Sequence, residues 1–279
     1  MTALLKELGK RTLIMGILNV TPDSFYDGGR YNQVEVAVRH ALEMVEAGAD
    51  LIDVGGESAR PGSDPIPADE EFRRVLPVIR AIREQSDVPI SIDSYKAEVA
   101  EAALAAGADW VNDIGALRLD ERMVEVVAER QIPVVLMHMQ SVPKTMQQHP
   151  TYDDVVDDII RFFKERIAFA IAAGIFETHI IIDPGIGFGK TVTHNIEILH
   201  RLDEFRSLGR PILIGTSRKS FLEAISDLPI TERLAGTIAS NAIAIMNGAD
   251  IIRVHDVKEM KRAVEIVDAV KYGCQRPVP

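Results

Sequence analysis

The sequence contains very little cysteine, since Cys274 is the only one among its 279 residues. A disulfide within the chain is therefore excluded, and a reducing cytoplasm is the expected location. No recognisable motif surrounds Cys274, so we expect it to play no part in the function.

Long apolar runs are also missing, and basic residues are too scattered to form a patch. No segment approaches the roughly 20 apolar residues that span a membrane, and the run at residues 12–18 is too short for a signal peptide. The 42 acidic residues outnumber the 31 basic ones, and the net charge is -11. We therefore expect neither a membrane nor a nucleic acid as a partner, and an anionic ligand must be held by a local cluster of cations.

Apolar residues are abundant, and one short phrase occurs three times among them. It reads Gly-Ala-Asp, two apolar residues and one polar residue. The copies occupy residues 48–53, 107–112 and 248–253, and they end in Asp53, Asn112 and Arg253. Each copy predicts a helix that stops at the glycine, a tight turn and a buried strand. We expect the polar residue that ends each copy to carry chemistry.

The spacing of apolar residues predicts eight strands with helical segments between them. We place the strands near residues 12–18, 50–54, 89–93, 108–112, 132–137, 178–183, 211–215 and 250–254. The clearest helix covers about residues 152–173, and its apolar face is expected to hold Val155, Val156, Ile159, Ile160, Phe163, Ile167 and Ile171. Alternating strands and helices predict an α/β protein with a parallel sheet. Eight such units favour a closed (β/α)8 TIM barrel, with residues 1–279 as a single domain.

Loop lengths predict where the site lies. The loops that follow strands are long at residues 19–32, 55–68 and 138–151, whereas those that precede strands are short. Long loops after the strands are typical of the active face of a barrel. Because Asp50, Asp109 and Asp250 begin strands, we expect them to stabilise the opposite face.

Several strands end in a polar residue. Asp93 and Asp183 end apolar strands, and with Asn112 they offer a donor and acceptor set that suits a planar heterocycle. The alternative is a structural salt-bridge network in the barrel mouth. The glycine-rich segment at residues 182–191 is similar to a Walker loop, but Pro184 stands where the first glycine is required. We expect its glycines to let the backbone approach a flat ligand, with Phe188 as an apolar wall.

Cationic residues gather after the second, seventh and eighth strands. They are Arg60, Arg218, Lys219, Arg253 and His255. Barrels often bind phosphate after the last two strands, so these residues predict a phosphate site. Asn19 could add an oxygen ligand to a Mg2+ ion that bridges phosphates. The other histidines have no metal-ligand spacing.

Together these motifs resemble the dihydropteroate synthase family. The resemblance rests on residues 15–25, 53–58, 60–62, 182–190, 217–220 and 253–256, which occur in the family's order. It implies a transferase of folate biosynthesis that joins p-aminobenzoate to the methylene carbon of a dihydropterin diphosphate and releases diphosphate. It also implies a pterin-binding TIM barrel that is a cytoplasmic homodimer, uses Mg2+ and is a sulfonamide target.

The resemblance also implies roles for individual residues. It assigns the pterin ring to Asp93, Asn112, Met137, Asp183 and Lys219, and the diphosphate to Asn19, Arg60, Arg253 and His255. The p-aminobenzoate pocket and its loops take Asp23, Phe25, Pro61, Phe188 and Ser220. The catalytic residues are Asp93, Asp183, Lys219 and Arg253, and Asn19 is the metal ligand. Where the family has Thr, this chain has Ala59, which places one hydroxyl contact to p-aminobenzoate or a sulfonamide in doubt.

The expected chemistry needs no covalent nucleophile, and no catalytic triad is recognisable. Diphosphate leaves first, in an SN1-like step, and the electron-rich pterin supports the resulting cation. Two alternatives remain open: a pterin methyltransferase that uses methylated folate, and a paralogue that binds pterin without turnover. At residues 231–247 apolar and small residues cover most faces of a predicted helix, in agreement with a homodimer.

Overall fold

The computed structural model describes residues 2–21, 30–227 and 229–273. Asp23 and Phe25, which the resemblance places at the p-aminobenzoate pocket, lie outside the described residues. Cys274 lies outside them too.

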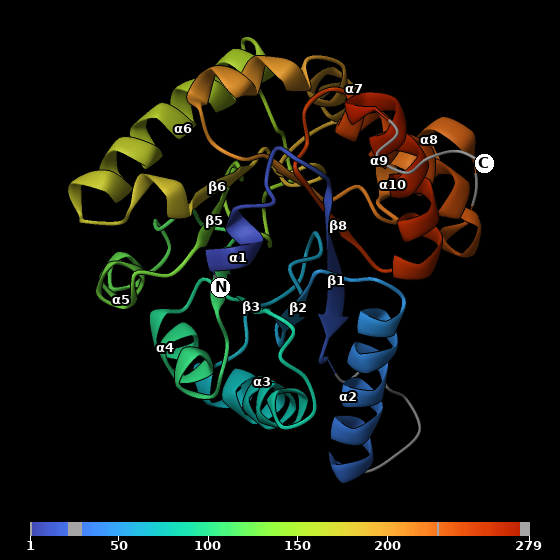
Figure 1. Cartoon of the computed structure of the whole chain (residues 1–279). Coiled ribbons are helices and arrows are strands. Elements are labelled where there is room, and N and C mark those ends of the chain that lie inside the picture. The colour runs from blue at the N-terminus through green and yellow to red at the C-terminus, as the bar shows by residue number, and fades with distance from the viewer. Residues whose placement is uncertain (1, 22–29, 228, 274–279) are drawn as a thin grey trace.

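Eight parallel strands form the centre of the molecule (Figure 1). They are β1 (Leu13–Asn19), β2 (Leu51–Gly55), β3 (Ile90–Asp93), β4 (Trp110–Asp113), β5 (Val134–Met137), β6 (Ile180–Asp183), β7 (Leu213–Ile214) and β8 (Ile251–Val254). Their order is β6-β5-β4-β3-β2-β1-β8-β7. A parallel bridge between Ile182 and Ile212 joins β6 to the residue before β7. The predicted (β/α)8 barrel is confirmed, and each predicted strand overlaps an observed one.

Helices surround this barrel (Figure 1). The α-helices are α1 (Thr2–Leu5), α2 (Arg30–Glu46), α3 (Ala68–Arg83), α4 (Ala97–Ala105), α5 (Met123–Arg130), α6 (Val155–Ala172), α7 (Val192–His200), α8 (Ser220–Ser226), α9 (Leu234–Met246) and α10 (Val257–Tyr272). Short 3-10 helices are η2 (Glu177–His179), η3 (Leu202–Leu208) and η4 (Ile230–Glu232). None of the helices within the described ranges is both long enough and apolar enough to cross a membrane.

Helix α6 is the helix that the sequence predicts most clearly. It begins after Asp154, whose carboxylate accepts hydrogen bonds from the backbone N–H groups of Val156 and Asp157 at 2.9 and 3.0 Å. Most of the predicted apolar face is buried, but Ile160 is only partly buried and Ile171 is 36% exposed, while Ala170 is buried instead. The predicted positions are four residues apart, which is more than the 3.6 residues of one helical turn. The predicted row therefore drifts around the helix, and in the last turn Ala170 lies on the buried face in place of Ile171.

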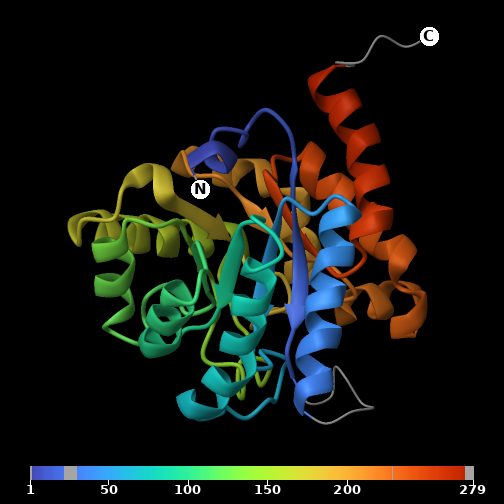
Figure 2. The ribbon, with the colours of Figure 1, turned by 60° about the horizontal axis from the view of Figure 1, so that its bottom comes forward.

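The amino-terminal end of the barrel is filled and covered. Its innermost layer is fully buried and consists of Leu13, Met15, Leu51, Trp110, Val135, Ile181, Leu213 and Ile251. Leu4, Leu5 and Leu8, in and just after α1, pack against this layer. Figure 2 shows α1 at one end of the barrel, while the arrow of β1 points to the other end. A ligand can therefore reach the interior only from the carboxyl ends of the strands.

The three Gly-Ala-Asp copies share one structural function at the closed end. Their glycines, Gly48, Gly107 and Gly248, have φ of 103°, 115° and 115°, which non-glycine residues rarely adopt. The aspartate of each copy accepts a hydrogen bond from a backbone N–H at the start of a neighbouring strand. The pairs are Asp50 with Ile14 at 2.8 Å, Asp109 with Ile90 at 3.0 Å, and Asp250 with Ile212 at 2.9 Å. These aspartates thus stabilise the face opposite the long loops, as predicted.

Candidate active site

The polar residues that end the three Gly-Ala-Asp copies meet inside the barrel. Asn112 Nδ2 donates to Asp53 Oδ2 at 2.9 Å, and Arg253 Nε donates to the same oxygen at 2.6 Å. Arg253 Nη2 also donates to Asp93 Oδ2 at 2.6 Å. β2, β3, β4 and β8 therefore supply one continuous hydrogen-bonded network at the mouth.

Burial controls the charges in this network. Burial alone would lower the pKa of Arg253, but the carboxylates of Asp53 and Asp93 outweigh it and raise that pKa. Burial raises the pKa of Asp93 to about 7, although Arg253 opposes the shift. Asp53 is fully buried, and its Oδ1 has no hydrogen-bond partner among the described residues. An unpaired carboxylate oxygen at this depth is costly unless a ligand donates to it.

A second charged pair lies across the mouth, on the β6 and β7 side. Asp183 is 6% exposed, and its Oδ1 accepts a hydrogen bond from the backbone N–H of Gly185 at 2.7 Å. Lys219 lies directly before α8, donates to the carbonyl of Ile186, and has its Nζ 4.6 Å from the ring centroid of Phe188. Burial lowers the pKa of Lys219 to about 8, and the charge of Asp183 opposes this.

An apolar cluster also lies at the mouth. Its buried members are Ile114, Met137, Met139 and Met146. Phe188 and Ala59 pack against it, together with Tyr95 and Leu119. Met137 and Phe188, both predicted site residues, thus form one apolar surface. Ala59 contributes a methyl group to the same surface, where a threonine would add a hydroxyl.

His255 lies at the end of β8 and is oriented by a serine. Its Nδ1 is 3.0 Å from Ser217 Oγ, and its backbone N–H donates to the same oxygen at 3.2 Å. Because the serine oxygen accepts from the backbone, its O–H can donate to Nδ1, which leaves the proton of a neutral imidazole on Nε2. Burial, followed by the charge of Arg253, lowers the pKa of His255 to about 4.

The remaining predicted residues lie around the rim. Asn19 ends β1 and is paired in register with Gly55, which is itself paired with Asp93. Arg60 is exposed, and its charge helps to lower the pKa of His255. Pro61 and Ser220 occupy exposed positions rather than the buried network. Arg218, which the sequence groups with the phosphate-binding cations, forms an ion pair with Asp256.

The glycine-rich loop after β6 packs closely against the loop after β5. Gly185 has φ of 71°, and a Cβ there would lie 2.0 Å from the carbonyl oxygen of His138. A Cβ on Gly189, with φ of 63°, would lie 2.8 Å from the carbonyl oxygen of Gln140. The close approach that the glycines permit is therefore to neighbouring backbone, which the sequence did not indicate.

A buried lysine fastens the same two loops. Lys190 is 2% exposed, and its Nζ lies 3.0 Å from His138 Nδ1, 3.3 Å from His138 O and 3.0 Å from Phe188 O. Burial lowers the pKa of Lys190 well below its usual value. Lys190 thereby fixes the backbone that carries Phe188.

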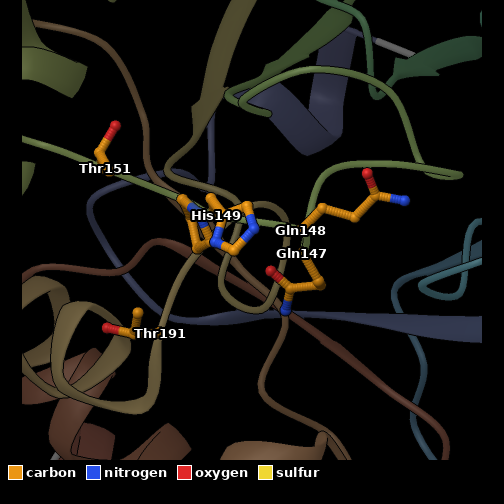
Figure 3. Close-up of a pocket in the computed structure, with 6 residues that line it drawn as sticks. Gln147, Gln148, His149, Thr151 and Thr191 are labelled. Carbon is orange, nitrogen blue, oxygen red and sulfur yellow. The ribbon is translucent and has the colours of Figure 1, made fainter.

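An open depression of about 550 Å³ lies outside this contact, between the loop after β5 and the start of α7 (Figure 3). It is lined by Gln147, Gln148, His149, Pro150, Thr151 and Thr191. None of these six is a predicted site residue. Gln147 accepts from the backbone N–H of Lys190 at 3.1 Å, so this wall supports the glycine-rich loop from outside.

The described residues contain no group of three or more His, Cys, Asp or Glu side chains arranged to hold a metal ion. A cation at the mouth would therefore need most of its oxygen ligands from a substrate or from water. Mg2+ is often bound in this way, by one or two protein groups and the phosphates of a substrate. The amide oxygen of Asn19, at the end of β1, fits that limited role.

Sequence reasoning missed two residues of the mouth, Lys190 and Ser217. Asp53 was expected to carry chemistry because it ends the first Gly-Ala-Asp copy, but only the structure shows its role as the shared acceptor of Asn112 and Arg253. Lys190 lies within the motif at residues 182–190, but the sequence does not indicate that its side chain is buried. Ser217 lies within the motif at residues 217–220, and only the structure shows that it contacts His255.

Comparison with known proteins agrees with this geometry. The family model described as "Pterin binding enzyme" matches residues 15–255. A dihydropteroate synthase of Clostridium beijerinckii is 48% identical over 264 residues, which cover 94% of this chain and 96% of the relative.

Two solved structures are similar over nearly the whole chain. A dihydropteroate synthase of Clostridium difficile, determined in the presence of pteroic acid, has a TM-score of 0.90 and 48% identity, covering 95% of this chain and 98% of that one. The Xanthomonas albilineans dihydropteroate synthase with 4-aminobenzoic acid has a TM-score of 0.88 and 45% identity, covering 96% and 94%. The chain therefore belongs to the pterin-binding enzymes and, among them, to the dihydropteroate synthase family.

Proposed function

We propose that the chain condenses a dihydropterin methyl diphosphate with p-aminobenzoate in the mouth of its barrel, giving dihydropteroate and diphosphate. The observation that carries this proposal is the Asn112–Asp53–Arg253–Asp93 network, which presents buried acids, an amide and a guanidinium to one cavity mouth. Similar proteins with bound pteroic acid and 4-aminobenzoic acid support the choice of substrates.

The pterin ring binds between the two charged groups. Asp183 and Asn112 accept and donate at the edge of the ring, while Lys219 donates to a ring acceptor. Met137, which is 4% exposed at the end of β5, packs on one face. Asp53 Oδ1, which is buried and has no partner in the described part of the chain, is a further acceptor for ring N–H or amino groups.

The diphosphate binds on the β8 side. Arg253 and His255 lie at the end of that strand, and the Nε2–H of a neutral His255 can donate to a phosphate oxygen. Arg60, in the loop after β2, adds a further positive charge to this side of the mouth, and its charge contributes to the lowered pKa of His255. Asn19 would hold a Mg2+ ion, which would supply neutralisation of the charge on the leaving group.

Bond breaking precedes bond formation. The bond between the methylene carbon and the diphosphate oxygen breaks, and both electrons leave with the diphosphate. The methylene cation is delocalised over the electron-rich pterin, and the carboxylates of Asp93 and Asp183 stabilise it electrostatically. The amine nitrogen of p-aminobenzoate then forms the new C–N bond and loses one proton to solvent or diphosphate. Arg253 remains charged throughout, because its carboxylate neighbours raise its pKa.

The p-aminobenzoate lies toward the rim. Phe188 forms an apolar wall, and Pro61 and Ser220 lie at exposed positions from which they can contact the ring and its carboxylate. Since Ala59 packs on the methionine cluster beside Phe188, it makes this wall apolar.

We also propose that the chain forms a homodimer through α9. One face of this helix is buried, with Thr237, Asn241, Ala244 and Ile245. A second stripe is exposed and apolar, and it consists of Ala235, Ala239, Ile243 and Met246, of which the last two are 52% and 50% exposed. Light scattering of the wild type should give twice the mass of the chain, and Ile243→Glu should give a monomer. A monomeric wild type would contradict the proposal.

The direct test of the function is diphosphate release by the purified protein. Protein, Mg2+, dihydropterin methyl diphosphate and p-aminobenzoate should together release diphosphate and form dihydropteroate in equal amounts. Omitting p-aminobenzoate should abolish product, and omitting Mg2+ should slow the reaction. Pterin binding without product would indicate a binding protein instead of an enzyme.

A further inference from the structure

The loop between β2 and α3 covers residues 56–67 and carries Arg60 and Pro61 at its exposed tip. A carboxylate with no role in the proposed reaction lies near its start. Glu57 has a side chain that is only 10% exposed. A charge is rarely buried to this extent unless it is fully paired, so its partners indicate what it does.

Glu57 joins the two ends of its own loop to the segment after β3. Its Oε2 accepts from the backbone N–H of Ile66 at 3.0 Å, which closes the loop on itself. The same oxygen accepts from Lys96 Nζ at 2.6 Å, and Oε1 accepts from the Tyr95 hydroxyl at 2.9 Å. Tyr95 and Lys96 follow Asp93 by two and three positions in the chain. The base of the loop is thus fastened to the strand that presents Asp93.

A second buried carboxylate strengthens the arrangement. Glu71, in the first turn of α3, is 1% exposed, and its Oε2 accepts from Lys96 Nζ at 2.5 Å. Burial raises the pKa of Glu71, and Lys96 opposes that shift. Lys96 therefore lies between two buried carboxylates, so removing one member leaves uncompensated charge.

The tip of the loop is held much more weakly. The backbone N–H of Gly62 donates to the carbonyl of Pro143 at 3.1 Å. Lys144 and Asp64 form an ion pair at 2.7 Å, but their side chains are 64% and 75% exposed. Exposed pairs of this kind contribute little to stability. The buried contacts at the base therefore determine where the loop leaves the barrel.

We propose that Glu57, with Tyr95 and Lys96, positions the loop for p-aminobenzoate. Glu57 does not touch substrate. It sets the distance between Pro61 at the loop tip and Asp93 at the end of β3, and thereby the width of the second substrate's pocket. The inference depends on the proposed function for the identity of that substrate.

The kinetic test uses Glu57→Gln, which keeps the shape of the side chain, and Tyr95→Phe, which removes a single hydrogen bond. Glu57→Gln should raise the KM for p-aminobenzoate about tenfold, because a hydrogen bond to a charged group of this kind is lost. The KM for the pterin diphosphate should rise much less, by about twofold, because Arg60 is the one proposed diphosphate ligand on this loop and the ligands at the strand ends stay in place. Tyr95→Phe should act in the same direction and more weakly.

Asp109→Asn is the matched control. Like Glu57, Asp109 accepts from one cationic side chain, Arg83 at 2.7 Å, and from one backbone N–H, that of Ile90 at 3.0 Å. Asp109 lies at the closed end of the barrel. The Asp109→Asn variant should therefore lower the thermal midpoint of unfolding without changing either KM. Equal rises in both KM values for Glu57→Gln, or no change in the KM for p-aminobenzoate, would overturn the inference.

A second readout needs no turnover. Hydrogen exchange of the segment at residues 58–66 should be faster in Glu57→Gln than in the wild type or in Asp109→Asn, because the acceptor of the Ile66 N–H loses its negative charge and the ion pair with Lys96. Unchanged exchange would also overturn the inference. If instead the wild type forms no dihydropteroate while hydrogen exchange is faster in Glu57→Gln as expected, the proposed function is wrong, but the positioning of the loop by Glu57 is supported.

Discussion

At the scale of single residues, Asp183 and Lys219 are the most direct test of pterin binding. Asp183→Asn keeps the size of the side chain but removes the charge that faces Lys219. Because the variant loses a charge-assisted acceptor in a buried site, we expect the affinity for a pterin analogue to fall by at least about tenfold. Isothermal titration calorimetry measures this directly, and Lys219→Ala should behave in the same way.

Asp250→Asn provides the control for that measurement. It makes the same chemical change at the closed end of the barrel, where Asp250 accepts from the backbone of Ile212. Its pterin affinity should equal that of the wild type. Equal affinity in Asp183→Asn and the wild type would remove Asp183 from the site.

The protonation of Lys219 predicts a pH dependence of binding. Burial lowers its pKa to about 8, so the side chain is charged below that pH and neutral above it. A neutral amine is a weaker donor, so pterin affinity should fall as the pH rises through about 8. Calorimetry between about pH 6.5 and 9.5 covers this range. An affinity that stays flat throughout would contradict the assignment.

Sequence reasoning at this scale predicts where a residue lies when that residue is at or next to the carboxyl end of a strand. Asp93, Asn112, Asp183 and Arg253 occupy such positions, and a barrel brings strand ends together regardless of their separation in the chain. The repeat aligns Asp53 with Asn112 and Arg253, but only the structure shows that Asp53 is the acceptor that the other two share. Glu57 is missed because its partners Tyr95 and Lys96 lie 38 and 39 positions away, and no local pattern reports that contact.

At the scale of elements, the glycine-rich loop after β6 is the least tolerant segment. A methyl group on Gly185 would lie 2.0 Å from the carbonyl oxygen of His138, so the loop must shift to accept it. We expect Gly185→Ala to lower the free energy of unfolding by about 2 to 4 kcal/mol, and to weaken pterin binding because Asp183 Oδ1 is bonded to the Gly185 N–H. Urea denaturation and calorimetry measure the two effects.

Gly174→Ala isolates the steric part of that effect. Gly174 also has a positive φ, of 96°, but a Cβ there would meet nothing within 4 Å. It should lose only about 1 kcal/mol from backbone strain and retain full pterin affinity. Equal losses in the two variants would show that the approach to His138 does not matter.

Elements differ in how far the sequence predicts them. Strands and helices have a period that the apolar residues report, so all eight strands and α6 are found within a few residues. Loops have no period, and their conformation depends on contacts from elsewhere. The β6 loop is an example, because its glycines serve an approach to the β5 loop that is visible only in three dimensions.

At the scale of the whole molecule, the closed end of the barrel governs stability and the open end governs chemistry. Asp250→Asn should reduce the free energy of unfolding by about 1 to 2 kcal/mol, because it weakens the hydrogen bond to Ile212 beside the last strand. Its kcat/KM for both substrates should match that of the wild type. A large fall in kcat/KM with unchanged stability would show that the two ends are coupled.

The single domain, the cytoplasmic location and the homodimer stay predictions, whereas the barrel architecture and the family are established by topology and similarity. The sequence is sufficient to predict the barrel architecture, because the order of the strands follows from the alternation of strands and helices. It is insufficient to establish the location and the homodimer, because these depend on surfaces and surroundings outside one chain.

The junction of β6 and β7 has one more consequence. Only a single bridge, between Ile182 and Ile212, connects the described strands there. Asp183 lies on one side of this seam and Lys219 on the other. A pterin that contacts both residues links β6 to β7, where the barrel has the fewest strand contacts. Tight ligands should therefore reduce local opening of the barrel, and they should slow amide hydrogen exchange in β6 and β7 more than in β2 and β3.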